Sequence, residues 1–110
     1  MKQGEIWYAE LNPIKGSKQA GLRPVVIISG NLLNEHLNVV IVVPLTSKIK
    51  GYKGNSIIES SKESGLKNES ELLVFHVRSV SKERLVRQLG KVKPEVIREV
   101  VKTLNEILKY

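Results

Sequence analysis

The hydrophobic pattern over the first ninety residues is typical of short β-strands. Residues 4–11 (GEIWYAEL) alternate loosely, and residues 24–29 (PVVIIS) and 38–46 (NVVIVVPLT) are β-branched runs. Weaker patterns predict further strands over residues 56–59, 71–80 (ELLVFHVRSV) and 86–92, and the polar interlude at residues 30–37 has room for one helical turn. The sequence therefore predicts five or six strands.

A different period begins at Pro94. Apolar residues then recur with the spacing of one broad helical face, at Val96, Ile97, Val100, Val101, Leu104, Ile107 and Leu108. Proline suits the first helical turn, where its missing N–H costs nothing. We expect this helix to pack with its apolar strip on a small, strongly bent antiparallel barrel, a mainly β (α+β) fold. With 110 residues, the chain has room for one core, so residues 1–110 are predicted to form a single domain.

Several classes of site are excluded by composition. The chain has no Cys and no Asp, all eleven acids are Glu, and His36 and His76 lie forty residues apart. No disulfide framework, thiolate zinc site or spaced metal-ligand motif is available, so we expect neither a metal nor another cofactor. The longest apolar run, residues 39–45, is far shorter than the roughly 20 residues that cross a bilayer. No signal peptide is visible, and a cytoplasmic protein that does not enter membranes is expected.

The charge of the chain favours a polyanionic partner. Lysine and arginine total 18 against 11 acids, which gives a net charge of +7. The excess is spread over both halves of the chain rather than gathered in a tail, and nucleic acid is the partner that such a balance suits. The alternative is that these charges serve solubility alone.

The segment between the first two predicted strands, residues 12–22 (NPIKGSKQAGL), is longer than a hairpin needs. Its glycines allow the backbone to approach an anion, and Arg23 directly after it can grip phosphate oxygens with two N–H groups. The alternative is an ordinary hairpin loop with Arg23 as a surface charge. The segment adds four polar side chains as candidate contacts: Lys15, Ser17, Lys18 and Gln19.

Two further positions carry candidate chemistry. Thr46 and Ser47 follow directly on the strongest strand, where a well-held hydroxyl can donate to a phosphate oxygen. His76 and Arg78 are expected to share one strand face by the period of two, and the imidazole can act as a general acid or base near neutral pH. The alternatives are a threonine that caps its strand and a histidine that serves packing.

The order of these segments resembles the MazF/PemK family of toxin endoribonucleases. Residues 4–13 and 15–29 are similar to its opening strand of type G-D/E-I/V-W/V/Y, its loop of type P-x-x-G-S-E-Q-x-G-x-R-P and the apolar strand after it. Residues 44–47 (PLTS) resemble its P-L/V-T-S/T element. Residues 73–85 (LVFHVRSVSKERL) resemble its V-x-x-x-Q-I/V/L-R/K-T/S-I/V-x-x-x-R-L segment, and Gly90 resembles the glycine that follows. The resemblance covers nearly the whole chain.

The resemblance implies a fold and an activity. The fold would be an SH3-like barrel with an added helix, working as a homodimer, and the activity would be cleavage of single-stranded mRNA, neutralised by a cognate antitoxin. By this likeness, Arg23 is the catalytic arginine and Thr46 the catalytic threonine. Two positions depart from the family pattern: Lys18 replaces the acid of G-S-E-Q, and His76 replaces the Gln before the I/V/L-R/K pair.

Side-chain chemistry agrees with metal-free cleavage of RNA. The substrate's own 2′-hydroxyl can be the nucleophile, so the protein need only orient it, stabilise the phosphorane and protonate the leaving 5′-oxygen. Arg23 would be the cation at the phosphorane and Thr46 a donor to it. A basic groove would track the phosphates. Its expected RNA contacts are Lys15, Ser17, Lys48, Lys50, Tyr52, Lys53 and Arg78, with Lys18, Gln19, Ser47 and His76 as possible catalytic or RNA contacts.

The partner and two competing functions follow from the same features. An antitoxin that blocks a protein of charge +7 is expected to present an acidic, flexible segment that folds as it binds. One alternative is a toxin of the same fold that binds a protein target such as DNA gyrase without cleaving RNA. The other is a non-catalytic RNA-binding SH3-like module, which would lose affinity steeply with salt and leave RNA intact.

Overall fold

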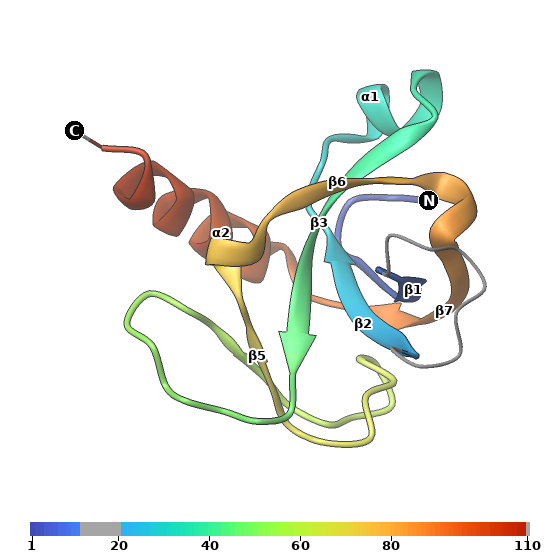
Figure 1. The fold of residues 1–110 in the computed structure, drawn as a ribbon. Helices are drawn as coiled ribbons and strands as arrows, with labels where there is room; N and C mark the ends of the chain where they lie inside the picture. Colours follow the sequence, from blue (N-terminus) through green and yellow to red (C-terminus); the bar gives the residue numbers. More distant parts are fainter. Residues whose placement is uncertain (12–20, 110) are drawn as a thin grey trace.

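The computed structural model describes residues 1–11 and 21–109, and its chain forms a curled antiparallel sheet with one long helix beside it (Figure 1). Most of the predicted functional loop at residues 12–22 thus lies outside the described residues. In chain order the elements are β1 (Glu5–Glu10), β2 (Leu22–Ile27), α1 (Asn31–His36), β3 (Val39–Thr46), β4 (Ile57–Ile58), β5 (Ser70–Leu72), the 3₁₀ turn η1 (Val74–His76), β6 (Arg78–Ser81), the 3₁₀ turn η2 (Lys82–Arg84), β7 (Leu85–Lys91) and α2 (Pro94–Ile107).

The sheet is antiparallel throughout and runs in the order β4-β5-β3-β2-β1-β7. β6 also pairs with β3, beside the stretch that β5 leaves free. Strands β1, β2 and β3 form the middle, and β5 and β6 curl away from β3 at its two ends (Figure 1). The predicted mainly β fold, a small bent antiparallel barrel with a C-terminal helix, is confirmed, with the sheet curled into a half-barrel.

Both faces of the central strands are buried, as their unbroken apolar runs require. In β2, Val25 and Ile27 face one apolar cluster while Val26 between them faces the other, because side chains alternate along a strand. The first cluster is filled from β1, β3, β6 and β7, and the second is closed by α2. Strands of this kind carry few polar side chains, so polar chemistry is confined to the strand ends.

The helix α2 begins at Pro94, in the first turn as predicted. Most of its apolar strip packs on the second cluster, with Val100 fully buried and Val96, Ile97, Leu104 and Ile107 partly buried. Two members of the predicted strip, Val101 and Leu108, are exposed instead. The expectation that the barrel covers the whole strip was therefore wrong at these two positions, which lie at the margin of the face.

The predicted continuous strand over residues 71–80 is broken. β5 pairs with the end of β3 and β6 with its beginning, and η1 lies between them. Three steps along β3, from Val42 to Leu45, correspond to six steps along the opposite segment, from Arg78 back to Leu72. The 3₁₀ turn takes up the additional residues.

Pro44 gives the physical reason for this break. The backbone C=O of Pro44 accepts a hydrogen bond from the N–H of Leu73 at 2.9 Å, so this side of Pro44 faces the segment that joins β5 to β6. In a strand the N and the C=O of one residue point to the same side, and proline has no N–H to donate there. The ladder loses its donor at Pro44, and the chain turns at η1 instead of continuing as a strand.

Candidate functional site

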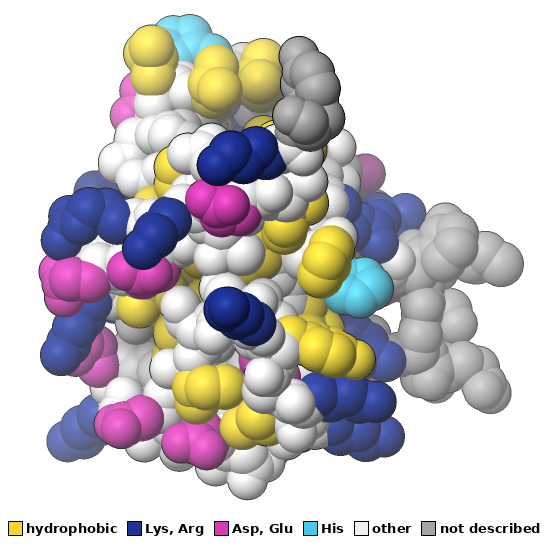
Figure 2. Space-filling view, turned by 90° about the vertical axis from the view of Figure 1, so that its left-hand side faces the viewer, with side chains coloured by type: hydrophobic (Ala, Val, Ile, Leu, Met, Phe, Trp, Pro, Cys, Tyr) yellow, Lys and Arg dark blue, Asp and Glu magenta, His cyan; other side chains and the backbone are white. Residues whose placement is uncertain are grey.

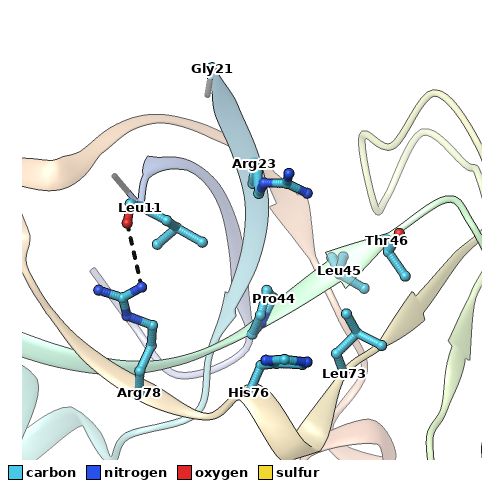
Figure 3. Close-up of a pocket in the computed structure, with 9 residues that line it drawn as sticks. All are labelled: Leu11, Gly21, Arg23, Pro44, Leu45, Thr46, Leu73, His76 and Arg78. Atoms are coloured by element: carbon cyan, nitrogen blue, oxygen red, sulfur yellow. Dashed lines mark hydrogen bonds between the residues drawn. The ribbon is translucent and has the colours of Figure 1, made fainter. Parts of the chain in front are cut away.

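A cleft of about 450 Å³ opens at the ends of β2 and β3. Arg23, Thr46, His76 and Arg78 line it, above a floor that includes Pro44 (Figure 3). Four of the predicted site residues, which span 56 positions of the sequence from 23 to 78, thus meet in one cavity. Leu11, Gly21, Leu45 and Leu73 complete the lining.

The register of the central strands puts Arg23 and Thr46 on facing ends. Arg23 pairs with Ala9 of β1, which holds its backbone in the sheet. β2 and β3 pair as far as Val25 and Pro44, and two further residues in this antiparallel register bring Arg23 opposite Thr46. The side chain of Arg23 is exposed and extends from β2 toward the side on which Thr46 lies (Figure 3).

Thr46 is the last residue of β3, and its side chain is half-buried. Its Oγ1 accepts the backbone N–H of Lys48 at 3.1 Å. That bond uses a lone pair of the hydroxyl oxygen and leaves its hydrogen available for donation. The strand and this local bond hold the hydroxyl in place at the cleft, with a hydrogen that can reach a ligand oxygen.

His76 and Arg78 reach the cleft from different elements. The predicted shared strand face is wrong, because His76 ends η1 and Arg78 begins β6. The turn still directs the exposed imidazole toward Pro44, and Nη1 of Arg78 lies 3.5 Å from the backbone oxygen of Leu11, just before the segment outside the described residues (Figure 3). The cleft therefore combines one imidazole, one hydroxyl and two guanidinium groups.

A second cleft of about 480 Å³ adjoins the first and shares Arg23, Leu45 and Thr46 with it. The predicted residues Ser47 and Lys48 line this second cleft. Tyr8 of β1 lines it as well. So do Lys67 and Asn68, which the sequence did not mark because the polar segment over residues 60–70 has no pattern. Arg23 and Thr46 thus stand between two adjoining hollows, an arrangement suited to a chain-like ligand that continues on both sides.

The remaining predicted RNA contacts among the described residues do not line these two clefts. Lys50 and Tyr52 are exposed on the loop after β3 and line neither of these two clefts. Lys53 lines a different cleft of about 660 Å³, against α2 and the exposed ring of Phe75. Four predicted residues lie outside the described part of the chain: Lys15, Ser17, Lys18 and Gln19.

Glu71 is a residue that the sequence analysis missed. It lies on β5 as the register partner of Thr46, and its side chain is fully buried. The hydrogen bond from the Asn55 side chain and those from the backbone N–H groups of Lys50, Gly51 and Tyr52 lower the pKa of Glu71, against an opposing effect of burial. An acid at the start of the predicted strand over residues 71–80 was the signal that could have marked it, because buried glutamates are rare without partners.

Within residues 1–11 and 21–109, no group of three or more His, Cys, Asp and Glu side chains is placed to hold a metal ion. In the same part of the chain, no helix combines the length and the apolar character needed to cross a membrane.

Comparison with known proteins identifies similar chains. Residues 2–108 match a family model described as PemK-like, MazF-like toxin of type II toxin-antitoxin systems. The chain is 30% identical to endoribonuclease EndoA of Bacillus subtilis (strain 168), covering 96% of this chain and 91% of the relative. It is 34% identical to endoribonuclease MazF of Staphylococcus saprophyticus, covering 91% and 84%. A structure of an endoribonuclease in complex with its cognate antitoxin, from a mycobacterial species, has the same fold, with a TM-score of 0.78 at 21% identity, over 98% of this chain and 94% of that one.

Proposed function

Because the chain belongs to the family of PemK-like, MazF-like toxins of type II toxin-antitoxin systems, we propose that it is a metal-independent endoribonuclease that cuts single-stranded mRNA at specific sequences. Two relatives that it matches over most of their length are named endoribonucleases, which supports this activity. We further propose that residues 1–110 act as one domain and that the protein works in the cytoplasm.

The observation that carries the proposal is the position of Arg23 and Thr46 between two adjoining clefts. A ribose-phosphate chain that runs from one cleft into the other would bring one phosphodiester between these two side chains. The guanidinium can meet two phosphoryl oxygens at once, and the Thr46 hydroxyl can donate a third hydrogen bond. The interactions of both groups would be strongest with the phosphorane, because it carries an extra negative charge.

The reaction that these groups support needs no water as nucleophile. The 2′-hydroxyl gives up its proton to solvent and attacks the adjacent phosphorus, so that a P–O bond forms to the 2′-oxygen and the P–O bond to the 5′-oxygen breaks. The products are a 2′,3′-cyclic phosphate and a 5′-hydroxyl. Arg23 and Thr46 stabilise the phosphorane, and His76 is the side chain in the cleft that can hand a proton to the leaving 5′-oxygen.

The proposed regulatory partner is a cognate antitoxin. The mycobacterial endoribonuclease of the same fold forms a complex with its antitoxin. On the present chain the net charge of +7, with Arg23, Lys48 and Lys67 along one cleft, suits an acidic, flexible segment laid over the RNA site. Such a segment would compete directly with RNA.

We also propose a homodimer, and α1 offers an apolar surface for it. Leu32, Leu33 and Leu37 of this region are exposed, as are Val39 and Ile41 on the adjoining strand β3. Apolar side chains gather at the top of the molecule, over α1 (Figure 2). Leu33→Glu at this surface is expected to give a monomer by light scattering, and a monomeric wild-type protein would contradict the proposal.

The decisive experiment incubates the purified protein with a long unstructured RNA in excess EDTA. Discrete fragments that end in 2′,3′-cyclic phosphate are expected from the wild type and from Arg98→Ala, a change at an exposed arginine of α2. Arg23→Ala and Thr46→Ala should each lower the rate about 100-fold. Intact RNA with the wild type, together with inhibition of DNA gyrase, would refute the proposal and support a toxin that binds a protein target.

A further inference from the structure

The loop that follows Thr46, residues 47–56, closes around the carboxylate of Glu71. One oxygen, Oε1, accepts the backbone N–H groups of Lys50 at 2.8 Å and Gly51 at 3.1 Å. The other oxygen, Oε2, accepts the N–H of Tyr52 and the side-chain amide Nδ2 of Asn55, both at 3.0 Å. Four donors from six consecutive residues of one loop therefore converge on one side chain.

These contacts specify a carboxylate. All four partners are N–H donors, and only an ionised carboxyl group offers acceptors on both oxygens. Glu71 is 0% exposed, so water cannot replace a missing partner without an opening of the loop. The same hydrogen bonds lower the pKa of Glu71, which keeps the group ionised at neutral pH.

The backbone of the loop fits this role. Gly51 has φ +70, a left-handed conformation that side chains with a Cβ rarely adopt, and it turns the chain so that successive N–H groups point inward. At the far side, Nδ2 of Asn55 binds Glu71 while its Oδ1 lies 3.4 Å from the N–H of Val74, just before His76. Asn55 thus ties the loop to the turn η1, whose last residue, His76, lines the cleft.

This loop carries four of the proposed RNA contacts, Lys48, Lys50, Tyr52 and Lys53. Lys48 lines the second cleft, and Lys50 and Tyr52 project from the residues whose backbone the carboxylate holds. Glu71 is also the register partner of Thr46. We propose that Glu71 is a positioning residue for single-stranded RNA, fixing this loop in the one conformation in which its lysines and Tyr52 meet the substrate; this rests on the proposed function.

The test is Glu71→Gln, which keeps the volume of the side chain. The new amide oxygen can still accept two of the N–H groups, whereas its NH₂ group faces two donors and loses both bonds. We expect KM to rise about tenfold with kcat within about threefold, because Arg23 and Thr46 lie on strands outside the loop. Glu69→Gln makes the same change of charge at an exposed position and should leave KM unchanged.

Two direct measurements separate positioning from a general loss of structure. By amide hydrogen exchange, the backbone amides whose acceptor becomes the NH₂ group, either that of Tyr52 or those of Lys50 and Gly51, should exchange at least about tenfold faster in Glu71→Gln. The Leu72 amide, bonded to the backbone oxygen of Ser56, should stay protected. Binding of a 2′-O-methyl RNA, which lacks the nucleophile, should weaken about tenfold without any cleavage step.

A second variant leaves the Glu71 side chain unchanged. Gly51→Ala adds a Cβ that meets nothing within 4 Å but disfavours φ +70, so it disturbs the loop alone. It should weaken RNA binding in the same direction, whereas Gly30→Ala, also in open space and without a positive φ, should not.

The outcomes distinguish the two proposals. If the wild type cleaves RNA and Glu71→Gln keeps its KM and its RNA affinity, the role of Glu71 is refuted and the nuclease stands. If the wild type leaves RNA intact while Glu71→Gln still weakens binding and frees the loop amides, the nuclease is refuted and the positioning role stands. A fall in kcat alone, with KM and loop exchange unchanged, also overturns the positioning role.

Discussion

Replacement of Thr46 by valine tests the site at a single atom. Valine keeps the branched shape at the end of β3 and removes only the hydroxyl, which lies in the cleft and accepts the Lys48 N–H at 3.1 Å. If this hydroxyl donates to the phosphorane, its loss removes about 3 kcal/mol of transition-state stabilisation, a factor of about 100 in kcat.

The same change should cost little stability. The lost acceptor serves one backbone N–H, that of Lys48, which is exposed, so water can take its place at a cost of about 1 kcal/mol or less. For a domain of this size that corresponds to a fall in Tm of less than about 8 °C. A 100-fold loss of kcat in a protein that still unfolds cooperatively is therefore the expected signature of a catalytic hydroxyl.

The assay is single-turnover cleavage of a short RNA that holds one cleavage site, with excess enzyme and EDTA, followed by calorimetry of each variant. Thr46→Ser retains the hydroxyl and should keep the rate within about tenfold of the wild type. In the double variant with Arg23→Ala, the loss should be smaller than the product of the two single losses, because both side chains act on the same phosphorane. A folded Thr46→Val protein that cleaves within about threefold of the wild-type rate would refute the role of this hydroxyl.

Three further predictions concern His76 of the turn η1, the tight packing at Gly90 of β7 and the buried carboxylate of Glu71. His76→Gln should lower kcat, whereas His36→Gln on α1 should leave kcat unchanged; an unaltered kcat in His76→Gln would show that the imidazole takes no part in proton transfer. Gly90→Ala should destabilise the fold by about 3 kcal/mol in urea unfolding, since its Cβ would collide with the backbone oxygen of Glu63, whereas Gly30→Ala should destabilise it by less than about 1 kcal/mol. Because folding lowers the pKa of Glu71, its contribution to stability is complete above the ordinary glutamate pKa of about 4.3 and is lost as pH falls through the lower native value. Below about pH 4.3, Tm of the wild type should therefore fall more steeply with pH than Tm of Glu71→Gln. Parallel curves of Tm against pH would contradict this.

The sequence predicted those parts of the fold that depend on local pattern. The β-branched runs predicted over residues 24–29 and 38–46 correspond to β2 (Leu22–Ile27) and β3 (Val39–Thr46), with shifted ends, and the 3.6-residue period after Pro94 is a helix. Both signals need only neighbouring residues. Arg23 and Thr46 were found for a related reason: each marks the end of a strand, and the resemblance of the surrounding segments assigned them a role. The structure adds that both side chains line one cleft.

The missed features depend on contacts between distant segments. The break after Leu72 comes from the absent N–H of Pro44, almost thirty residues earlier, and no local pattern in the second segment carries that information. Glu71 likewise finds its four donors at residues 50–55. From the sequence of its own strand, a buried carboxylate is unfavourable because no neighbouring residue offers it hydrogen bonds. Only the folded loop supplies the donors that offset the cost of burial.

One interruption of the sheet supports both of these features. Because the ladder on this side of β3 stops at Pro44, β3 is paired twice, with β5 carrying Glu71 beside Thr46 and with β6 carrying Arg78 beside Val42. A continuous strand would keep one register and leave no place for the turn that brings His76 over Pro44. The two partners leave β3 at its two ends, so one can anchor the loop after Thr46 while the other, with the turn before it, lines the cleft. The missing N–H of a single proline thus separates the group that orders the loop from the groups that line the proposed catalytic cleft.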